Sequence, residues 1–94
     1  MLGLRPIAIP GSDGVIVALP GYTVVSVIVN NSSVPAADLL IYDNASAGSG
    51  NLIAVIPSTG ANGIYRIENQ CNLGIYVKNV SGWVGTIWIS GSAV

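Results

Sequence analysis

The sequence predicts an all-β domain: an antiparallel β-sandwich or jelly roll of seven or eight short strands, with a small barrel as the alternative. Three observations support this class. Short apolar runs rich in valine and isoleucine recur at close spacing, clusters of Gly, Asn, Ser and Pro separate them, and no segment shows helical periodicity. The 94 residues suit a single domain, residues 1–94, which would bury about 60 to 65% of the surface of its unfolded chain.

The N-terminal segment, residues 1–13, is expected to be an extended arm or an edge strand. Pro6 and Pro10 fix the backbone in extended conformations and exclude a helix. Ile7 and Ile9 alternate along this segment. We therefore expect both isoleucines to dock on a neighbouring surface.

The next strands are predicted from apolar runs bounded by turn residues. Between Ile64 and Asn69, Tyr65 and Ile67 share one face, whereas Arg66 and Glu68 share the other, which predicts one solvated face. Apart from the central pair described next, the predicted strands are Val15–Leu19, Tyr22–Asn30, Ile64–Asn69, Leu73–Lys78 and Trp83–Ser90.

The stretch from Asp38 to Pro57 predicts a central strand pair. Leu39–Tyr42 and Leu52–Ile56 are the two apolar runs, and Asp43–Asn51 is a polar, small-residue connection between them. Pro57 closes the second run because it cannot donate to a sheet ladder. We expect the connection to be an exposed, tolerant loop without chemistry, so that Ser46→Glu should do little.

Several predicted strands are apolar on both faces, which is unusual for an antiparallel domain with solvated outer faces. These strands are Val15–Leu19, Val24–Val29, Leu39–Ile41 and Leu52–Ile56. With so few residues available to build layers, we expect another chain to cover an outer face. The prediction is an obligate oligomer or a particle-bound subunit, in which Leu40→Glu or Ile53→Glu should disrupt folding or assembly.

The low charge of the chain also indicates a covered surface. Only 7% of the residues are charged, against about 25% in ordinary globular domains, and the net charge is −1. A free monomer of this composition would tend to associate. The single cysteine, Cys71, excludes an intrachain disulfide, so oligomerisation or attachment to a larger body is the expected source of additional stability.

The residue content argues against an enzyme. The chain has no histidine, which excludes His-based catalysis, and Cys71 has no base near it in sequence. Asp38 and Asp43 bracket a strand and should lie at its opposite ends. The oxygen donors between Asp43 and Asn51 do not have the spacing of a calcium loop, so we expect neither a metal nor any other cofactor.

Nucleic acid and membrane are not expected as partners. Three basic residues in three separate segments supply too little phosphate neutralisation, and Pro20 and Gly21 divide the longest apolar stretch. No signal-peptide pattern precedes Pro10, so we expect a protein that is made and kept in a cytosol until it is released.

Aromatic and apolar side chains are the candidate contact residues. Trp83 and Trp88 differ by an odd number along one predicted strand, so one should lie in the core and the other should be a contact anchor or a sugar-stacking platform. The full set of candidate protein-contact residues is Ile7, Ile9, Tyr22, Leu40, Tyr42, Ile53, Trp83 and Trp88.

One stretch carries a resemblance to a known group of proteins. Residues 40–50 read LIYDNASAGSG, preceded by VIVNNSS at 27–33 and followed by IYV at 75–77 and by Trp83–Ile89. A strand ending in IYD, a connection of this form and a second apolar strand resemble the small all-β structural proteins of tailed bacteriophages. The resemblance extends over about two thirds of the chain and carries no catalytic residue.

The resemblance implies a virion subunit, a capsid decoration or cement protein that binds the major capsid protein on the outer surface and bridges capsomers. It also implies a homo-oligomer, with a trimer favoured, that is assembled in the host bacterial cytoplasm. Two alternatives remain open. One is a tail, neck or head-completion component, and the other is a carbohydrate-binding or host-attachment module that uses an exposed Trp and the Asn-rich loops.

Overall fold

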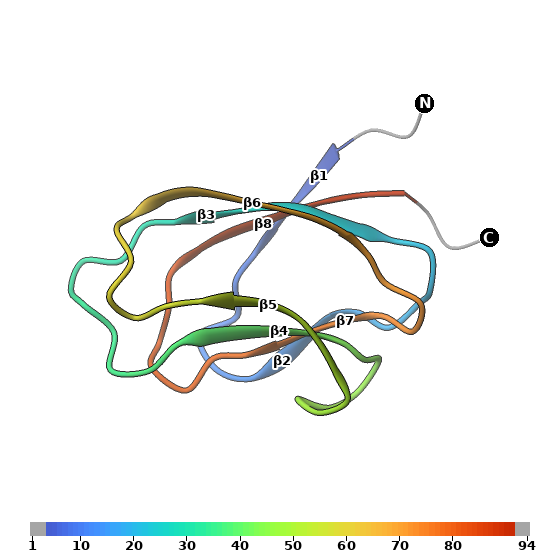
Figure 1. The fold of residues 1–94 in the computed structure, drawn as a ribbon, viewed down its shortest axis with the longest axis horizontal. Coiled ribbons are helices and arrows are strands. Elements are labelled where there is room, and N and C mark those ends of the chain that lie inside the picture. The colour runs from blue at the N-terminus through green and yellow to red at the C-terminus, as the bar shows by residue number, and fades with distance from the viewer. Residues whose placement is uncertain (1–3, 92–94) are drawn as a thin grey trace.

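A computed structural model describes residues 4–91 as eight antiparallel strands arranged in two four-stranded sheets, with no helix in that range (Figure 1). The two sheets lie over one another as the layers of a β-sandwich, which confirms the predicted all-β class. Sheet A has the order β1 (Leu4–Ala8), β8 (Gly85–Ser90), β3 (Thr23–Val29), β6 (Gly63–Gln70). Sheet B has the order β2 (Gly14–Val17), β7 (Ile75–Lys78), β4 (Leu39–Asp43), β5 (Asn51–Ile56).

The connections set the topology. Only the β4–β5 connection joins neighbouring strands of one sheet, and every other connection crosses from one sheet to the other. The predicted central pair is therefore the single sequential hairpin of the fold, at one edge of sheet B. All the remaining strand pairs join segments that lie far apart in the chain.

The core lies between the sheets and follows from the alternation of side chains along each strand. Sheet A contributes Val24, Val27, Val29, Ile87 and Ile89 to the fully or almost fully buried set, and sheet B contributes Leu39, Ile41, Ile56, Ile75 and Val77. The residues that point inward account for one of the two apolar faces that the sequence shows on these strands. The apolar residues between them point to the outer faces of the sheets, where their side chains remain partly exposed.

β-Bulges explain why the inward positions are not strictly alternating. In β3 the register moves from Val24↔Ile89 to Ser26↔Trp88, so Val25 is an extra residue against β8. Strict alternation from Val24 would point Val27 outward. The extra residue reverses the alternation, so Val27 points into the core.

The edge strands are all interrupted. β1 contains Pro6, which has no N–H, and the ladders of β2, β5 and β6 each have a register shift. In β6 the shift places Ile67 and Glu68 opposite one residue of β3, and Glu68 has a positive φ of 56°. Such interruptions disfavour pairing of a sheet edge with another chain.

The predicted strand boundaries need three corrections. Leu73 was expected within a strand but is 58% exposed in the bend before β7, and Trp83 precedes β8 instead of beginning it. β2 ends at Val17, not at Leu19. The N-terminal segment was expected to be an arm or an edge strand. Residues 4–8 form an edge strand that pairs with β8 along its length, and residues 1–3 lie outside the described range.

Candidate functional site

The loops gather at the two ends of the sandwich (Figure 1). We call residues 9–13, 30–38, 57–62 and 79–84 the four-loop end, because hydrogen bonds tie these connections together. Residues 18–22, 44–50 and 71–74 form the three-loop end. The two ends and the two outer sheet faces are the surfaces on which a function can be built.

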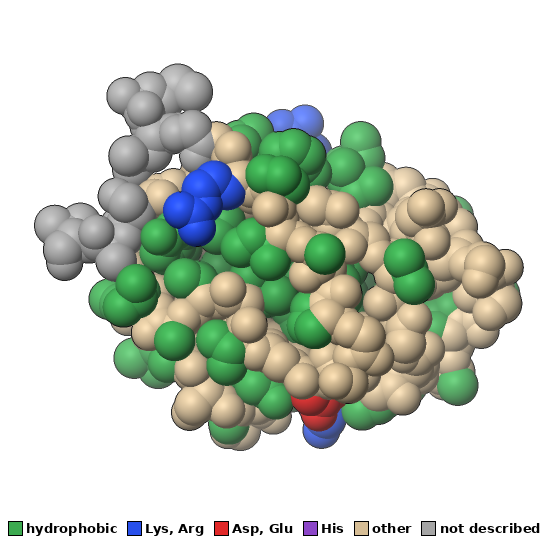
Figure 2. Space-filling model, turned by 180° about the vertical axis from the view of Figure 1, so that it is seen from behind, with side chains coloured by type: hydrophobic (Ala, Val, Ile, Leu, Met, Phe, Trp, Pro, Cys, Tyr) green, Lys and Arg blue, Asp and Glu red, His purple; other side chains and the backbone are tan. Residues whose placement is uncertain are grey.

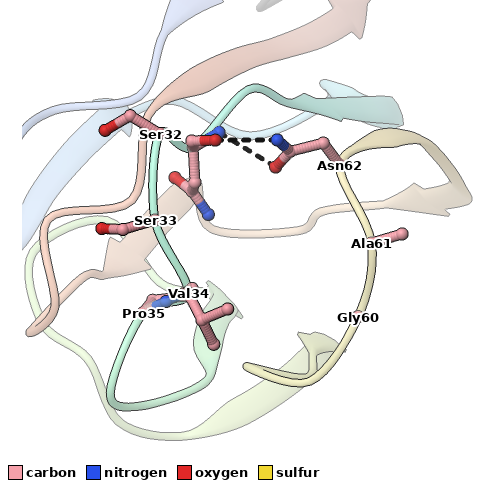
Figure 3. Close-up of a pocket in the computed structure, with 8 residues that line it drawn as sticks. Ser32, Ser33, Val34, Pro35, Gly60, Ala61 and Asn62 are labelled. Carbon is pink, nitrogen blue, oxygen red and sulfur yellow. Dashed lines mark hydrogen bonds between the residues drawn. The ribbon is translucent and has the colours of Figure 1, made fainter.

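Two asparagines clamp the four-loop end (Figure 3). The Asn31 N–H donates to Oδ1 of Asn62 at 3.0 Å, and Nδ2 of Asn62 donates to the Asn31 carbonyl at 2.7 Å. Oδ1 of Asn31 accepts the N–H of Val84 at 2.7 Å. The Asn62 carboxamide thus pairs with a main chain as a strand residue would, and three loops are held in fixed relation.

Asn79 joins the remaining loop to this end. Its buried carboxamide donates to the carbonyls of Pro10 at 2.7 Å and Trp83 at 3.1 Å, and it accepts the Trp83 N–H at 2.8 Å. Asp13 accepts the Asn79 N–H at 2.7 Å, and the Trp83 indole donates to the Ala37 carbonyl at 2.8 Å. Every hydrogen-bonding atom of the Asn79 carboxamide is therefore used inside the protein.

The surface of the four-loop end combines small polar groups with valines. A shallow hollow of about 270 Å³ lies between the β3–β4 and β5–β6 loops, and Figure 3 shows its lining. No charged side chain lines it. Val34 is 81% exposed at its rim, and Val80 and Val84 are exposed nearby. The carboxylates at this end, Asp13 and Asp38, lie outside the hollow and accept main-chain N–H groups of Asn79 and Ser58. The end presents a rigid and partly apolar contact surface.

Asp43 organises the three-loop end. Its carboxylate is 5% exposed and accepts the main-chain N–H groups of Asn72 at 2.9 Å, Leu73 at 2.8 Å and Gly74 at 3.4 Å. Burial raises the pKa of this carboxyl group, but the three N–H donors together outweigh burial and lower the pKa below its ordinary value. Asp43 is therefore ionised and serves as a structural anion that shapes the bend before β7.

Cys71 lies beside this carboxylate and is inert at neutral pH. Burial and the negative charge of Asp43 raise the pKa of the Cys71 thiol to about 11. A nucleophilic cysteine needs the opposite shift.

The β4–β5 loop folds back on sheet B. Asn44 accepts the N–H groups of Ser46 and Ala47 and donates to the Ser49 carbonyl. A β-carbon added at Gly48 would lie 3.2 Å from the Tyr76 ring, so this part of the loop covers the outer face. The expectation of a wholly exposed connection is wrong at Gly48, although Ser46 itself is exposed.

The outer face of sheet B is almost entirely apolar. Cross-strand registers place side chains of β2, β7, β4 and β5 in one row and side chains of β7, β4 and β5 in the next. The first row is Val15, Tyr76, Tyr42 and Leu52, and the second is Lys78, Leu40 and Val55. Lys78 is the one charged side chain in these two rows, and Val15, Leu52 and Val55 are exposed.

Sheet A is more polar on its outer face. Trp88 lies half-buried between Pro6 and Ser26, and the row ends at Arg66, which pairs with Glu68 at 3.6 Å. Figure 2 shows hydrophobic side chains spread over the face in view among polar groups, with few charged side chains between them.

The candidate contact residues fall into three groups. Ile9, Tyr22 and Trp83 lie in the core and leave almost no surface for a partner, which corrects their assignment as contacts. Ile7 and Ile53 are partly buried and pack against the core. Leu40 and Tyr42 lie on the outer face of sheet B, and Trp88 lies on that of sheet A.

The structural roles of Asp43 and of the loop asparagines Asn31, Asn62 and Asn79 were not predicted from the sequence. The carboxylate of Asp43 meets partners about thirty residues later in the chain, and Asn31 meets Asn62 across a similar separation. No local pattern identifies such pairs. The only available signal was that Asp43 directly follows an apolar strand and precedes a Gly-rich loop.

Within residues 4–91 no group of three or more acidic, cysteine or histidine side chains converges as a metal site would require. No helix capable of crossing a membrane occurs in the same range. Comparison of the chain with protein-family models, with curated proteins and with solved structures finds no match.

Proposed function

We propose that this chain is a structural subunit of a tailed-bacteriophage virion, a capsid decoration or cement protein that binds the major capsid protein at the outer shell. The alternative is that the chain is a tail, neck or head-completion component of the virion. The support is the resemblance of residues 40–50 together with the contact surfaces that residues 4–91 present on the outer face of sheet B and at the four-loop end. In this proposal the protein assembles in the host bacterial cytoplasm and bridges capsomers.

We also propose that the sandwich is a jelly roll. Its strand orders, β1-β8-β3-β6 and β2-β7-β4-β5, and its repeated crossing between sheets support this class. Jelly rolls are frequent among viral capsid and lectin domains. The topology is therefore in keeping with a virion subunit.

The observation that carries the proposal is the outer face of sheet B. Two rows of cross-strand neighbours expose apolar side chains there with one cation, Lys78, among them. We propose a second copy of the chain as the occupant, in a closed homo-oligomer with a trimer favoured. The interrupted edge strands favour association through faces over strand addition.

In this proposal, exposed loops of the protein bind the capsid shell. The four-loop end is the better candidate because its loops are held by side-chain hydrogen bonds and present exposed valines. Deletion of residues 1–10 would remove β1 and the core residue Ile9, so it would report on folding as well as on binding. Val34→Glu changes only an exposed loop residue and is the cleaner variant for capsid binding.

The substitution Leu40→Glu tests whether the outer face of sheet B is the contact between copies of the chain. Leu40 lies on the outer face of sheet B directly opposite Lys78, so the carboxylate in Leu40→Glu meets a cation across the strands and the fold is retained. We expect the wild type to sediment as an oligomer and Leu40→Glu as a folded monomer. Ser46→Glu, on the exposed part of the β4–β5 loop, is the matched control and should remain oligomeric.

A wild type that sediments as a stable monomer at micromolar concentration would remove the oligomer from the proposal. Protein copy number in purified virions separates the two alternatives, because a decoration protein is present in hundreds of copies and a tail part in few. Absence of the chain from purified virions would overturn the virion assignment itself.

Trp88 supports carbohydrate binding as a second candidate function. Its ring is partly exposed between Pro6 and the hydroxyl-bearing Ser26, whereas Trp83 is buried and excluded from such a role. An aromatic face beside a hydroxyl group suits a sugar ring. Glycan-array binding that is lost in Trp88→Ala would favour this function, and an array without signal would remove it.

A further inference from the structure

We infer that the Asn62–Gly63 bond is a site of spontaneous deamidation that opens the clamp between the β3–β4 and β5–β6 loops. Asn62 is the only asparagine in the chain that is followed by glycine. A glycine leaves its nitrogen unobstructed, and asparagine is among the thermolabile residues of proteins. This inference does not depend on the proposed function.

The geometry around Gly63 leaves room for the reaction. Asn62 is exposed, and a β-carbon added at Gly63 would meet no atom within 4 Å. Gly63 has a φ of 137°, a backbone conformation that side-chain-bearing residues rarely adopt. No side chain therefore crowds the main chain at Gly63, whose nitrogen is the attacking atom.

The clamp itself provides a donor at the reacting carbon. The Asn31 N–H lies 3.0 Å from Oδ1 of Asn62, the oxygen that becomes negative when a nucleophile adds to Cγ. A fixed N–H donor at a developing oxyanion lowers the barrier to addition. Asn31 is thus a positioning residue for the chemistry of Asn62.

The reaction consumes one water and releases one ammonia. The main-chain nitrogen of Gly63 bonds to Cγ of Asn62, the Cγ–Nδ2 bond breaks, and Nδ2 leaves as ammonia with the proton lost by the Gly63 nitrogen. Water then opens the resulting succinimide. Addition of water at Cγ gives aspartate, and addition at the main-chain carbonyl carbon gives isoaspartate.

Either product damages the clamp. In the wild type Nδ2 of Asn62 donates to the Asn31 carbonyl at 2.7 Å, and a carboxylate would place two acceptors against each other there. Isoaspartate additionally lengthens the main chain immediately before Gly63, whose partner in the β3–β6 ladder is Val29. The negative charge therefore loosens the β3–β4 loop, which carries Val34.

The first experiment follows the site by peptide mass spectrometry after incubation of the folded full-length chain at mildly alkaline pH. We expect the amide-to-acid mass shift to accumulate at residue 62 ahead of every other asparagine and to quicken as pH rises. Asn62→Gln, which keeps a carboxamide but cannot form the five-membered ring, is the control. Intact Asn62 after another asparagine has converted would overturn the inference.

The second experiment tests the consequence with Asn62→Asp. We expect a lower urea midpoint than wild type at neutral pH, with the deficit shrinking in acid, where the protonated carboxyl group can again donate to the Asn31 carbonyl. Asn62→Ala should show a deficit that does not vary with pH. An Asn62→Asp midpoint equal to wild type at neutral pH would show that the clamp is not opened.

Discussion

Replacing the buried carboxylate of Asp43 should be among the most damaging single changes in this protein. Asp43→Asn keeps the shape of the side chain but removes the charge, and it turns an amide N–H₂ toward main-chain donors. The carboxylate makes two short hydrogen bonds, to the N–H groups of Asn72 and Leu73, and a longer one to Gly74. Hydrogen bonds to a charged group contribute about 1.5 to 3 kcal/mol each, and the cost of burying the charge offsets part of that sum. We expect a net loss of about 2 to 4 kcal/mol in the free energy of unfolding.

The same contact predicts how stability depends on pH. The pKa of Asp43 is lower in the folded protein than its ordinary value of 3.8, so the unfolded chain takes up the proton first as pH falls. The contribution of Asp43 is therefore complete above that ordinary value and is lost as pH falls through the folded pKa. The stability difference between wild type and Asp43→Asn should be constant near neutral pH and shrink in acid.

Urea unfolding followed by tryptophan fluorescence measures this difference, because Trp83 is buried in the core. Asp38→Asn is the matched control: Asp38 is exposed and accepts one main-chain N–H, from Ser58 at 2.8 Å. We expect the control to lose less than about 1 kcal/mol. An Asp43→Asn loss no larger than that of Asp38→Asn, or one that does not change between neutral and acidic pH, would refute the reasoning.

Three further predictions concern Glu68, Gly74 and Cys71. Glu68→Gly should raise the free energy of unfolding, measured with urea, by about 1 kcal/mol, because Glu68 has a φ of 56° and its ion pair is exposed. Glu68→Ala keeps the β-carbon and should give no such gain. Gly74→Ala should lower the free energy of unfolding by about 1 to 3 kcal/mol and with it the thermal midpoint, because the added β-carbon would lie 2.6 Å from the Val17 carbonyl oxygen. A thermal midpoint equal to that of the wild type would contradict this prediction. Cys71, with a thiol pKa of about 11, should resist thiol reagents at mildly alkaline pH until urea unfolds the chain, and rapid labelling of the folded protein would contradict its burial.

Local patterns in the sequence were enough to predict the class of the fold and most of its strands. Regular apolar runs with Gly, Asn, Ser and Pro between them sufficed, because side-chain alternation and turn chemistry are local properties of the chain. The pair at Leu39–Asp43 and Asn51–Ile56 is the hairpin that the sequence predicted. Trp83 is buried and Trp88 is partly exposed, but Trp83 lies outside β8, so the spacing of the two residues along one strand is not the reason.

Which apolar face of each strand lies inside depends on strand pairing between distant parts of the chain. Local alternation names two faces, but β-bulges shift the parity within β3 and β5, and a bulge is set by pairing with strands distant in sequence. Long-range main-chain hydrogen bonds likewise place Ile9 and Tyr22, which lie just outside β1 and β3, in the core, and the pairing of β4 with β7 places Leu40 on an outer face. The Asp43 anion and the Asn31–Asn62 clamp have the same origin, because each joins residues about thirty positions apart that only the crossing of the chain between sheets brings together.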